Sequence, residues 1–230
     1  FVFSNVDELI CITSTLSSEI KKVFPACTNN HHILPVGFNK DFLNIEHKKN
    51  TKYDVIYSGN FSEWKGLDTL VEAISIIKHQ YNRDIKAVLI GANDQTKQQY
   101  ENQAKELSVF DNIEIVKRVE HKKIYSYIAL SKVGVLSNKY DADGLLFTSP
   151  LKLYEYLGSG LKVVVSRLPS IESNIDESLV YYATPENPES FAKEIIKALD
   201  DKSFNAQMVK DFAKDYTWKA RADKFTQFIS

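Results

Sequence analysis

The chain has 230 residues, a formal net charge of −1, 43% hydrophobic residues and 26% charged residues. This length suffices for one large domain, or for one domain and part of another, and the composition is ordinary for a globular protein. The small net charge gives no electrostatic case for nucleic acid or an anionic membrane as main partner, and no apolar stretch approaches the roughly 20 residues of a membrane span.

The chain begins with Phe1 rather than Met, and its first stretch already predicts a strand, so we expect a fragment of a longer protein. The opening residues lack the basic leader of a signal peptide. Cys11 and Cys27 have neither CxxC nor zinc-ligand spacing and are expected to be reduced structural thiols. These features predict a cytoplasmic protein. Peripheral contact with the inner face of the membrane would involve segments outside this chain.

Short apolar runs alternate with longer amphipathic runs along the chain. The apolar runs predict strands at 8–13, 31–38, 54–59, 86–91, 112–117, 132–138, 162–166 and 178–183. The amphipathic runs predict helices at 14–24, 67–80, 95–108, 121–130, 149–160 and 187–201, with a helical tail over 205–229 that breaks near Tyr216 and Thr217. The polar, aperiodic segment 39–52 predicts a linker and a domain boundary.

This alternation predicts an α/β fold, a doubly wound parallel sheet with helices on both faces and ligands at the carboxyl ends of its strands. Three predicted strands end near glycines, Gly37, Gly59 and Gly91, where backbone turns tightly or approaches a ligand. A plain tight turn is the alternative for each. Lys65 precedes the helix at 67–80, a place where a cation is unfavourable unless it meets an anion. An ordinary surface lysine is the alternative there.

The helix predicted at 149–160 has the features of a phosphate site. Ser149 suits the N-cap and Pro150 the first helical position, so free N–H groups of the first turn would face an anion. Lys152, at the third position, adds positive charge. Glu155 lies one turn further on the same face, where its carboxylate can accept hydrogen bonds from ribose hydroxyls. The alternative is a Lys–Glu surface pair that contributes a few tenths of a kcal/mol, and the residues alone leave both open.

Three stretches together resemble the GT-B glycosyltransferases of family 4 type. "SPLKLYEYLGSGLKVVVS" is similar to that family's S-P-x-K-x-x-E-Y-x-x-x-G-x-x-V-V segment, and "YSGNFSEWKGLDTLVEA" to its G-x-x-x-x-x-K-G-x-x-x-L-x-x-A segment. "ICITSTLSSEIKK" and "HHILPVGFNKDF" resemble the passage that joins its two Rossmann-like domains. The resemblance implies that 1–45 end an acceptor domain and form the connector, that 46–216 form a Rossmann-like donor domain, and that 217–230 form a helix returning toward the first domain.

The resemblance also implies a site for a nucleoside-diphosphate sugar. Lys65 and Lys152 would be the catalytic groups, because they would stabilise the charge that grows on the leaving diphosphate. Glu155 would bind the ribose. The remaining implied donor contacts are Gly59, Asn60, Arg118, Val119, Ser149, Pro150 and Leu151. Arg118 and Val119 belong to the loop 117–120, which would meet the nucleobase, and no metal or other cofactor is implied.

Two positions depart from the family pattern. Asn60 stands where the family often has an arginine, so one phosphate-binding charge is missing. Phe147 stands where a glutamate often touches the donor sugar, and Asp141 or Asp143 are candidates to replace that carboxylate. We expect the donor sugar to lie near Asp143, Phe147 and Thr148, although Asp143 is equally suited to be a solvated loop residue. The departures leave the donor sugar and the retaining stereochemistry open.

We therefore expect a retaining hexosyltransferase that moves a sugar from a nucleoside-diphosphate sugar to a saccharide or lipid-linked acceptor in bacterial polysaccharide or glycoconjugate biosynthesis. This chain would supply the donor site and be inactive without the acceptor domain. The alternative is a non-catalytic nucleotide- or sugar-binding module with a degenerate site. A GT-B-like epimerase is disfavoured, because its expected histidine and acidic residues cannot be placed. The five histidines are expected to be structural or solvent-facing: His31, His32, His47, His79 and His121.

Overall fold

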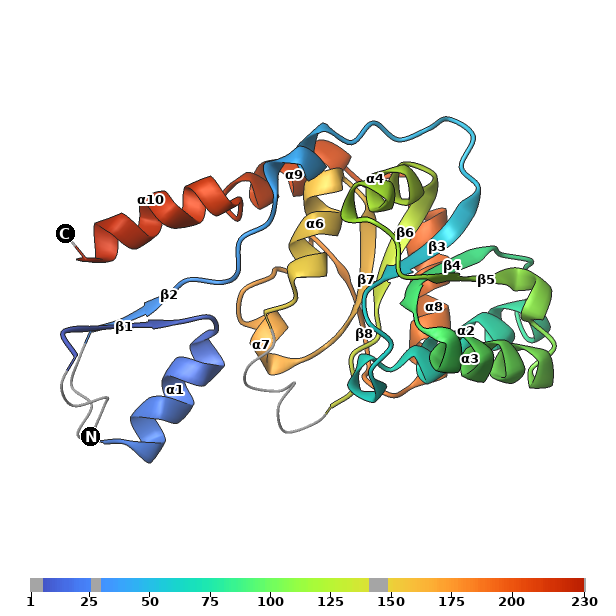
Figure 1. The fold of residues 1–230 in the computed structure, drawn as a ribbon, viewed down its shortest axis with the longest axis horizontal. Coiled ribbons are helices and arrows are strands. Elements are labelled where there is room, and N and C mark those ends of the chain that lie inside the picture. The colour runs from blue at the N-terminus through green and yellow to red at the C-terminus, as the bar shows by residue number, and fades with distance from the viewer. Residues whose placement is uncertain (1–5, 26–29, 141–148, 230) are drawn as a thin grey trace.

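The computed structural model describes residues 6–25, 30–140 and 149–229. Its main body is a parallel sheet of six strands in the order β5-β4-β3-β6-β7-β8 (Figure 1). The strands are β3 (Tyr53–Ser58), β4 (Ala87–Ala92), β5 (Ile113–Lys117), β6 (Ser131–Leu136), β7 (Lys162–Ser166) and β8 (Tyr181–Ala183). The chain crosses from one half of the sheet to the other between β3 and β6, as in dinucleotide-binding folds. The predicted doubly wound parallel sheet is confirmed.

Helices cover both faces of this sheet. One face packs against α2 (Leu67–His79), α3 (Asp94–Glu106) and α8 (Pro188–Asp200). The other packs against α4 (His121–Ala129), α6 (Leu151–Ser159) and α9 (Ala206–Lys214). Alternation along a strand divides the core into two clusters, because Val55 and Tyr57 of β3 face the α2 side and Ile56 faces the α6 side. Continuous apolar strands are therefore buried on both faces, as the sequence predicts.

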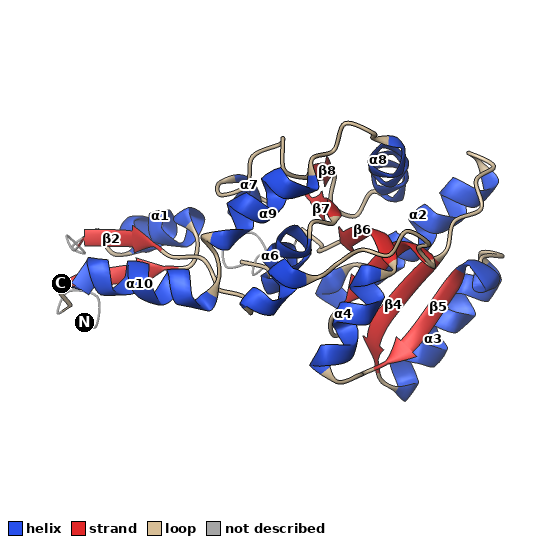
Figure 2. Cartoon of the chain, turned by 90° about the horizontal axis from the view of Figure 1, so that it is seen from above, coloured by secondary structure: helices blue, strands red, loops and turns tan. Residues whose placement is uncertain are grey.

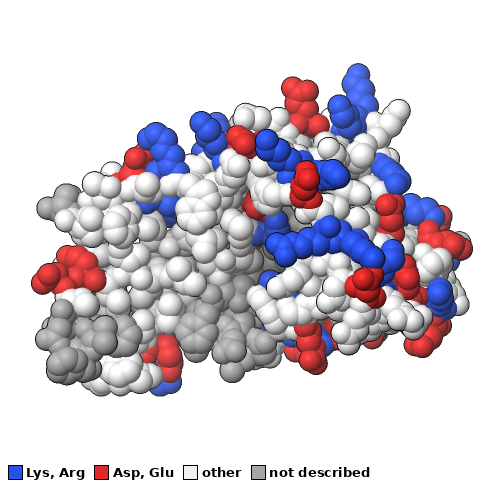
Figure 3. Space-filling model, viewed as in Figure 1, with Lys and Arg blue, Asp and Glu red and all other residues white. Residues whose placement is uncertain are grey.

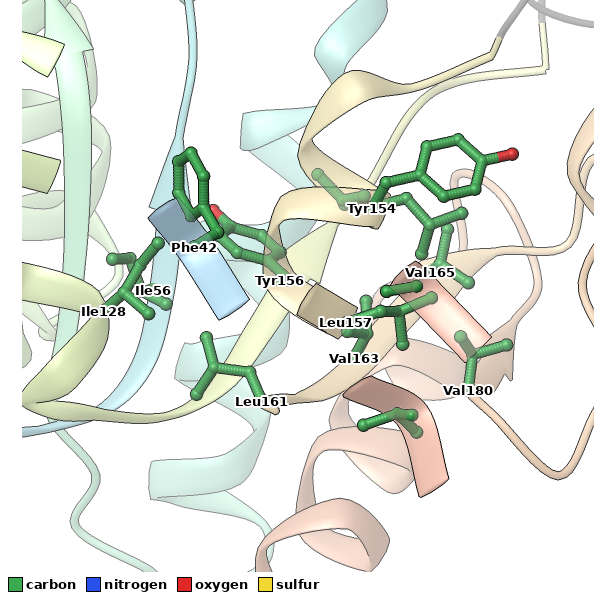
Figure 4. Packing of buried hydrophobic residues seen from close by; sticks show 14 of the residues in the cluster. Phe42, Ile56, Ile128, Tyr154, Tyr156, Leu157, Leu161, Val163, Val165 and Val180 are labelled. Atoms are coloured by element: carbon green, nitrogen blue, oxygen red, sulfur yellow. The ribbon is translucent and has the colours of Figure 1, made fainter. Parts of the chain in front are cut away.

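The prediction of an aperiodic linker over 39–52 is wrong in its first part. The 3-10 helix η1 (Lys40–Asn44) places Phe42 at 0% exposure in the α6-side core, with Tyr125 of α4 edge-on to it at 4.7 Å. Figure 4 shows Phe42 packed beside Tyr156 and near Ile56. A single apolar residue in a polar segment has no detectable period, but its burial attaches the connector to the sheet.

A second, smaller unit lies at one end of the molecule. β1 (Glu8–Cys11) and β2 (Asn30–Ile33) form a two-stranded parallel sheet. The helix α1 (Ser14–Val23) connects the two strands. Both ribbon views place this unit beside α10 (Trp218–Ile229) and apart from the six-stranded sheet (Figure 1, Figure 2). His32 stacks on Phe228 at 4.1 Å between ring centroids. Cys11 is buried in β1, and Cys27 lies outside the described residues.

The chain passes twice between this unit and the main sheet. Phe38 pairs with Thr217 in an isolated parallel bridge, and the N–H of Trp218 donates to the carbonyl of Phe38. The break expected near Tyr216 and Thr217 is confirmed, since α9 ends at Lys214 and α10 begins at Trp218. The strand predicted at 31–38 is too long, because the chain leaves β2 after Ile33.

Smaller differences have local causes. The strand predicted at 178–183 starts only at Tyr181, because the N–H groups of Ser178 and Leu179 both donate to Asp176 and form a turn. Besides η1, three short helices in the described part of the chain were not predicted: η2 (Glu63–Lys65), η3 (Phe110–Asn112) and α7 (Pro169–Glu172). Among the described residues, none of the helices combines the length and the apolar character that a membrane span requires.

Candidate functional site

A pocket of about 460 Å³ opens at the carboxyl ends of β3 and β4, next to the starts of α4 and α6. Its lining includes five of the predicted site residues, Gly59, Asn60, Arg118, Val119 and Lys152. Near the middle of the face drawn in Figure 1, Lys and Arg side chains border a hollow (Figure 3). The pocket therefore lies where doubly wound sheets bind ligands, and part of its lining is cationic.

Two glycines form the floor of this pocket. The N–H of Gly59 donates to the carbonyl of Ile90 at 2.9 Å, and Gly91 follows Ile90 with φ of +120°. A Cβ at Gly91 would lie 2.0 Å from the carbonyl oxygen of Gly59. The ends of β3 and β4 thus approach more closely than any side chain at Gly91 would permit, which leaves bare backbone at the pocket floor.

The start of α6 differs from the sequence prediction. Pro150 is the N-cap, with φ −74° and ψ 111°, and Leu151 is the first helical residue. Ser149 does not cap the helix, because its hydroxyl accepts a hydrogen bond from the N–H of Val36 at 3.2 Å. Lys152 is accordingly the second helical residue and not the third. The helix still begins with uncapped N–H groups beside the pocket, since no side chain of the described residues caps it.

Glu155 is the buried anion of the site. Its side chain is 2% exposed, and its Oε2 lies 2.6 Å from the Nζ of Lys152, whose side chain is 23% exposed. The Nε2 of His121 lies 3.5 Å from the other carboxylate oxygen. A surface ion pair leaves both partners in water, and this arrangement does not. The Lys–Glu pair is therefore a largely buried pair beside the pocket, with Lys152 in the pocket lining, and not surface decoration.

Tyr156, which directly follows Glu155 on α6, holds that helix against β3. The residue is 0% exposed, and its hydroxyl accepts the N–H of Ser58 at 2.8 Å and lies 3.1 Å from the Ser58 hydroxyl. Gly134 of β6 makes room for the ring, since a Cβ there would lie 2.4 Å from a Tyr156 ring carbon. The phenol thereby fixes the separation between the Ser58–Gly59 corner and the Lys152–Glu155 face.

Lys65 reaches the site from a loop that is fastened to β6. The hydroxyl of Ser137 donates to the carbonyl of Lys65 at 3.0 Å, and Gly66, at φ +63°, packs against the carbonyl of Ser137. Burial and, to a smaller extent, the charge of Lys152 lower the pKa of Lys65 to about 8. Its Nζ lies 3.5 Å from the ring centroid of Trp64. A half-buried lysine whose charge is disfavoured by burial and by a second lysine nearby is typical of an anion site.

The structure does not bring all predicted residues to this pocket. Pro150 and Leu151 contribute the helix start but not the pocket lining, and Ser149 is engaged by the connector. Lys65 and Glu155 do not line the pocket either, but both interact with Lys152, which does. Asp141, Asp143, Phe147 and Thr148 lie outside the described residues. Within the described part of the chain, no group of three His, Cys, Asp or Glu side chains is arranged to hold a metal ion.

His121 is the lining residue that sequence reasoning missed. Four histidines have the structural contacts expected of them, namely His31 with Ser17, His32 with Glu8, His47 with Ser159 and His79 with Leu107. His121 instead begins α4, lines the pocket and lies near Glu155. The available signal was its position directly after the loop 117–120. Its approach to Glu155, which is distant in sequence, could not be predicted.

Comparison with known sequences agrees with this geometry. The family model described as "Glycosyl transferases group 1" matches residues 39–215. The chain belongs to the glycosyl transferases group 1 family. A search of curated proteins gives no match. The matched range includes the pocket, η1 and the whole six-stranded sheet.

Solved structures share the fold of this group 1 glycosyltransferase chain at low sequence identity. Sucrose-phosphate synthase from Thermosynechococcus elongatus matches at a TM-score of 0.77 and 18% identity, over 98% of this chain and 58% of its own. A glycosyltransferase from Rickettsia africae matches at a TM-score of 0.80 and 13% identity, over 98% of this chain and 64% of its own. Anabaena HepE, solved in complex with UDP, matches at 0.75 and 13% identity, over 97% and 64%. The fold is thus that of the Rossmann-like domain of GT-B glycosyltransferases, and the chain spans about 58–64% of these proteins.

Proposed function

We propose that this chain supplies the donor site of a glycosyltransferase that takes a sugar from a nucleoside-diphosphate sugar. The observation that carries the proposal is the set of groups around one pocket: Lys65, Lys152, the uncapped start of α6 and the buried carboxylate of Glu155. The cations and N–H groups suit a diphosphate, and a buried carboxylate suits a ribose diol. Family membership and the UDP bound to HepE support the same class of ligand.

In this proposal Lys65 and Lys152 act on the leaving diphosphate, because fixed charges stabilise negative charge that increases in the transition state. Gly59, Gly91 and the backbone near Asn60 admit the phosphates, since they carry little side-chain bulk at the pocket floor. In the same proposal the base meets the loop with Arg118 and Val119, which line the pocket. In this proposal, groups outside this pocket bind the acceptor and determine the stereochemistry of the transfer.

The finer parts of the proposal rest on the resemblance alone. They comprise an acceptor-domain end at 1–45, a donor domain at 46–216, a returning helix at 217–230, a retaining hexosyl transfer and a saccharide or lipid-linked acceptor. Bacterial polysaccharide or glycoconjugate synthesis at the cytoplasmic face of the membrane is the proposed setting, and we expect the isolated chain to transfer no sugar. A non-catalytic binding module is the second candidate, which Asn60 in place of an arginine favours.

The proposal predicts that a nucleoside diphosphate stabilises the chain against heat. A ligand at about 100 times its Kd stabilises the folded state by about 2.7 kcal/mol, which for this length corresponds to about 5–10 °C in Tm. UDP, GDP and ADP are compared by differential scanning fluorimetry. Each is measured with Mn²⁺ and again with EDTA, because the structure does not describe the carboxylates of Asp141 and Asp143, which are able to bind a metal ion. No shift with any of the three at millimolar concentration, in either condition, contradicts the donor-site proposal.

Lys65 gives the proposed site a pH dependence. Its pKa of about 8 means that the free protein loses this charge as the pH rises through 8, whereas a bound diphosphate favours the protonated amine. The affinity for the diphosphate is therefore highest below pH 8, and it falls by up to about tenfold per pH unit above pH 8. Calorimetry with the best diphosphate from pH 7 to 9.5 measures the slope, in a range where the terminal phosphate is already fully ionised.

Lys65→Arg is the matched control, because a guanidinium stays charged throughout this range. The variant is expected to bind with an affinity that changes little between pH 7 and 9.5. A wild-type affinity that is constant over the same range, or an equal slope in both proteins, excludes Lys65 as the anion contact.

A further inference from the structure

The carboxyl end of β6 holds a buried amide that has no hydrogen-bond partner among the described residues. Asn138 is 1% exposed, and neither its side-chain oxygen nor its side-chain nitrogen has a hydrogen bond. Of the described residues, it is the one in which every side-chain polar atom is buried and unsatisfied. Buried amides are nearly always hydrogen-bonded, because removing them from water without a partner is costly. An amide kept in this condition indicates a partner that is not among the described residues.

The backbone around this amide is held firmly on both sides. The carbonyl of Asn138 accepts the hydroxyl of Ser166, at the end of β7, at 2.6 Å. On one side of it the Ser137 hydroxyl donates to the carbonyl of Lys65, and on the other the N–H of Lys139 donates to the carbonyl of Trp64. The backbone at Asn138 is therefore positioned by hydrogen bonds to β7 and to the Lys65 loop, while its side-chain amide takes part in none of these bonds.

Asn138 does not line the pocket itself, and the order of the strands places it beyond β3, on the β6 side of the pocket. Arg118 and Val119 lie at the β5 and β4 side, and Gly59 ends β3 in the middle. The Lys65 loop is fastened to β6, on the side of β3 opposite to β4. A nucleoside-diphosphate sugar is linear, with the base at one end and the sugar at the other. With the base at β4–β5 and the diphosphate at Lys65 and Lys152, the sugar extends toward the ends of β6 and β7.

We propose that Asn138 is a specificity-determining residue that hydrogen-bonds hydroxyl or amide groups of the donor's glycosyl unit. The inference rests on the proposed donor function and adds the recognition of the sugar. A carboxamide offers one acceptor oxygen and two donor hydrogens, so it pairs with the hydroxyl array of a hexose without adding charge beside the diphosphate. The position also matters because Phe147 stands where the family often has a sugar-binding glutamate.

The test compares Asn138→Leu with Asn112→Leu. Asn112 is a matched control, because it is a similarly buried amide at 2% exposure whose nitrogen donates to the carbonyl of Ile85 and to Asp84. Leucine at 138 removes an unsatisfied group, so Tm is expected to stay the same or to rise, whereas leucine at 112 leaves partners unpaired and lowers Tm. UDP, GDP and ADP are expected to bind Asn138→Leu as they bind the wild type.

The decisive measurement is the affinity for sugar conjugates relative to the parent diphosphate. Calorimetry is run with UDP-glucose, UDP-galactose, UDP-N-acetylglucosamine and GDP-mannose, and the wild type is expected to prefer at least one of them. Asn138→Leu is expected to lose about three- to tenfold in affinity for that conjugate and nothing for the diphosphate. Asn112→Leu is expected to keep the wild-type ratio.

Two results overturn the inference while the donor function stands: equal ratios of conjugate to diphosphate in wild type and Asn138→Leu, or an equal loss for both ligands. A Tm reduction in Asn138→Leu as large as that of Asn112→Leu also overturns it, because the amide would then have a partner within the fold. Failure of every diphosphate to bind the wild type contradicts the donor site itself, and the inference falls with it.

Discussion

Lys152→Ala is expected to weaken binding of a nucleoside diphosphate and of the corresponding monophosphate by about ten- to a hundredfold, with little effect on the nucleoside. Loss of a charged hydrogen bond typically costs about 1.5–3 kcal/mol. The loss is confined to ligands with phosphate, because Lys152 lies at the anion end of the pocket. It is increased by Glu155, whose buried carboxylate is left without its partner at 2.6 Å and then repels the phosphate. Calorimetry with the three ligands measures the pattern.

Glu155→Ala is expected to give the complementary pattern. It should weaken all three ligands, the nucleoside included, because each of them retains the ribose. General destabilisation of the pocket cannot produce a phosphate-dependent loss for Lys152→Ala and a loss for all three ligands for Glu155→Ala, provided that both variants remain folded. A uniform loss across ligands for Lys152→Ala, or no loss for Glu155→Ala, contradicts the assignment of this pair.

Lys214→Ala is the matched control for the ion pair. Lys214 and Asp211 are also three residues apart on a helix, with side chains 58% and 53% exposed. Breaking this exposed pair is expected to cost under about 0.5 kcal/mol of unfolding free energy and to leave nucleotide binding unchanged. Lys152→Ala is expected to cost more, although less than the about 3–5 kcal/mol of a fully buried pair, because the Lys152 side chain is 23% exposed.

Local features of the sequence predicted most of the fold. Apolar runs of strand length, with helical periods between them, predicted all six strands of the main sheet and the helices that cover it. The spacing of Lys152 and Glu155 predicted their contact, since residues three apart on a helix share a face. The sequence predictions were wrong where a residue bonds to a distant segment and not to its neighbours in the chain. Ser149 would cap α6 if it were free, but its hydroxyl is engaged by Val36, 113 residues away.

The site shows the same division between local and distant effects. Gly59, Lys65 and Lys152 follow patterns that can be found along the chain, whereas the roles of His121 and Asn138 depend on which strands are neighbours. Periodicity contains no information on the order β5-β4-β3-β6-β7-β8. That order brings the end of β6 next to β3 and places Asn138 beside the Lys65 loop. The burial of Glu155, which decides against a surface pair, likewise results from packing by several segments.

Gly91→Ala is expected to destabilise the chain by roughly 2–6 kcal/mol, the sum of the strain of a positive φ in a residue with a side chain and of overpacking against backbone. At φ +120° any L-residue is strained, and the new Cβ would lie 2.0 Å from the carbonyl oxygen of Gly59. That oxygen belongs to the backbone, so relief requires the ends of β3 and β4 to separate. Their separation breaks the 2.9 Å bond from the Gly59 N–H to Ile90. Urea unfolding measures the change, which is large compared with a total stability of about 5–15 kcal/mol.

Gly59→Ala is the matched comparison, because Gly59 ends the neighbouring strand at the same pocket floor. Its Cβ would meet the hydroxyl of Tyr57 at 2.8 Å, a side-chain atom and not backbone, and its φ is not positive. Displacing that hydroxyl weakens its 2.6 Å bond to the carbonyl of Asn60, a loss of about 0.5–1.5 kcal/mol. The stability of Gly59→Ala is therefore expected to exceed that of Gly91→Ala by at least about 0.5 kcal/mol, the gap between the nearest limits of the two ranges. Equal unfolding free energies for the two variants would show that the close approach of Gly59 and Gly91 does not hold these strand ends together.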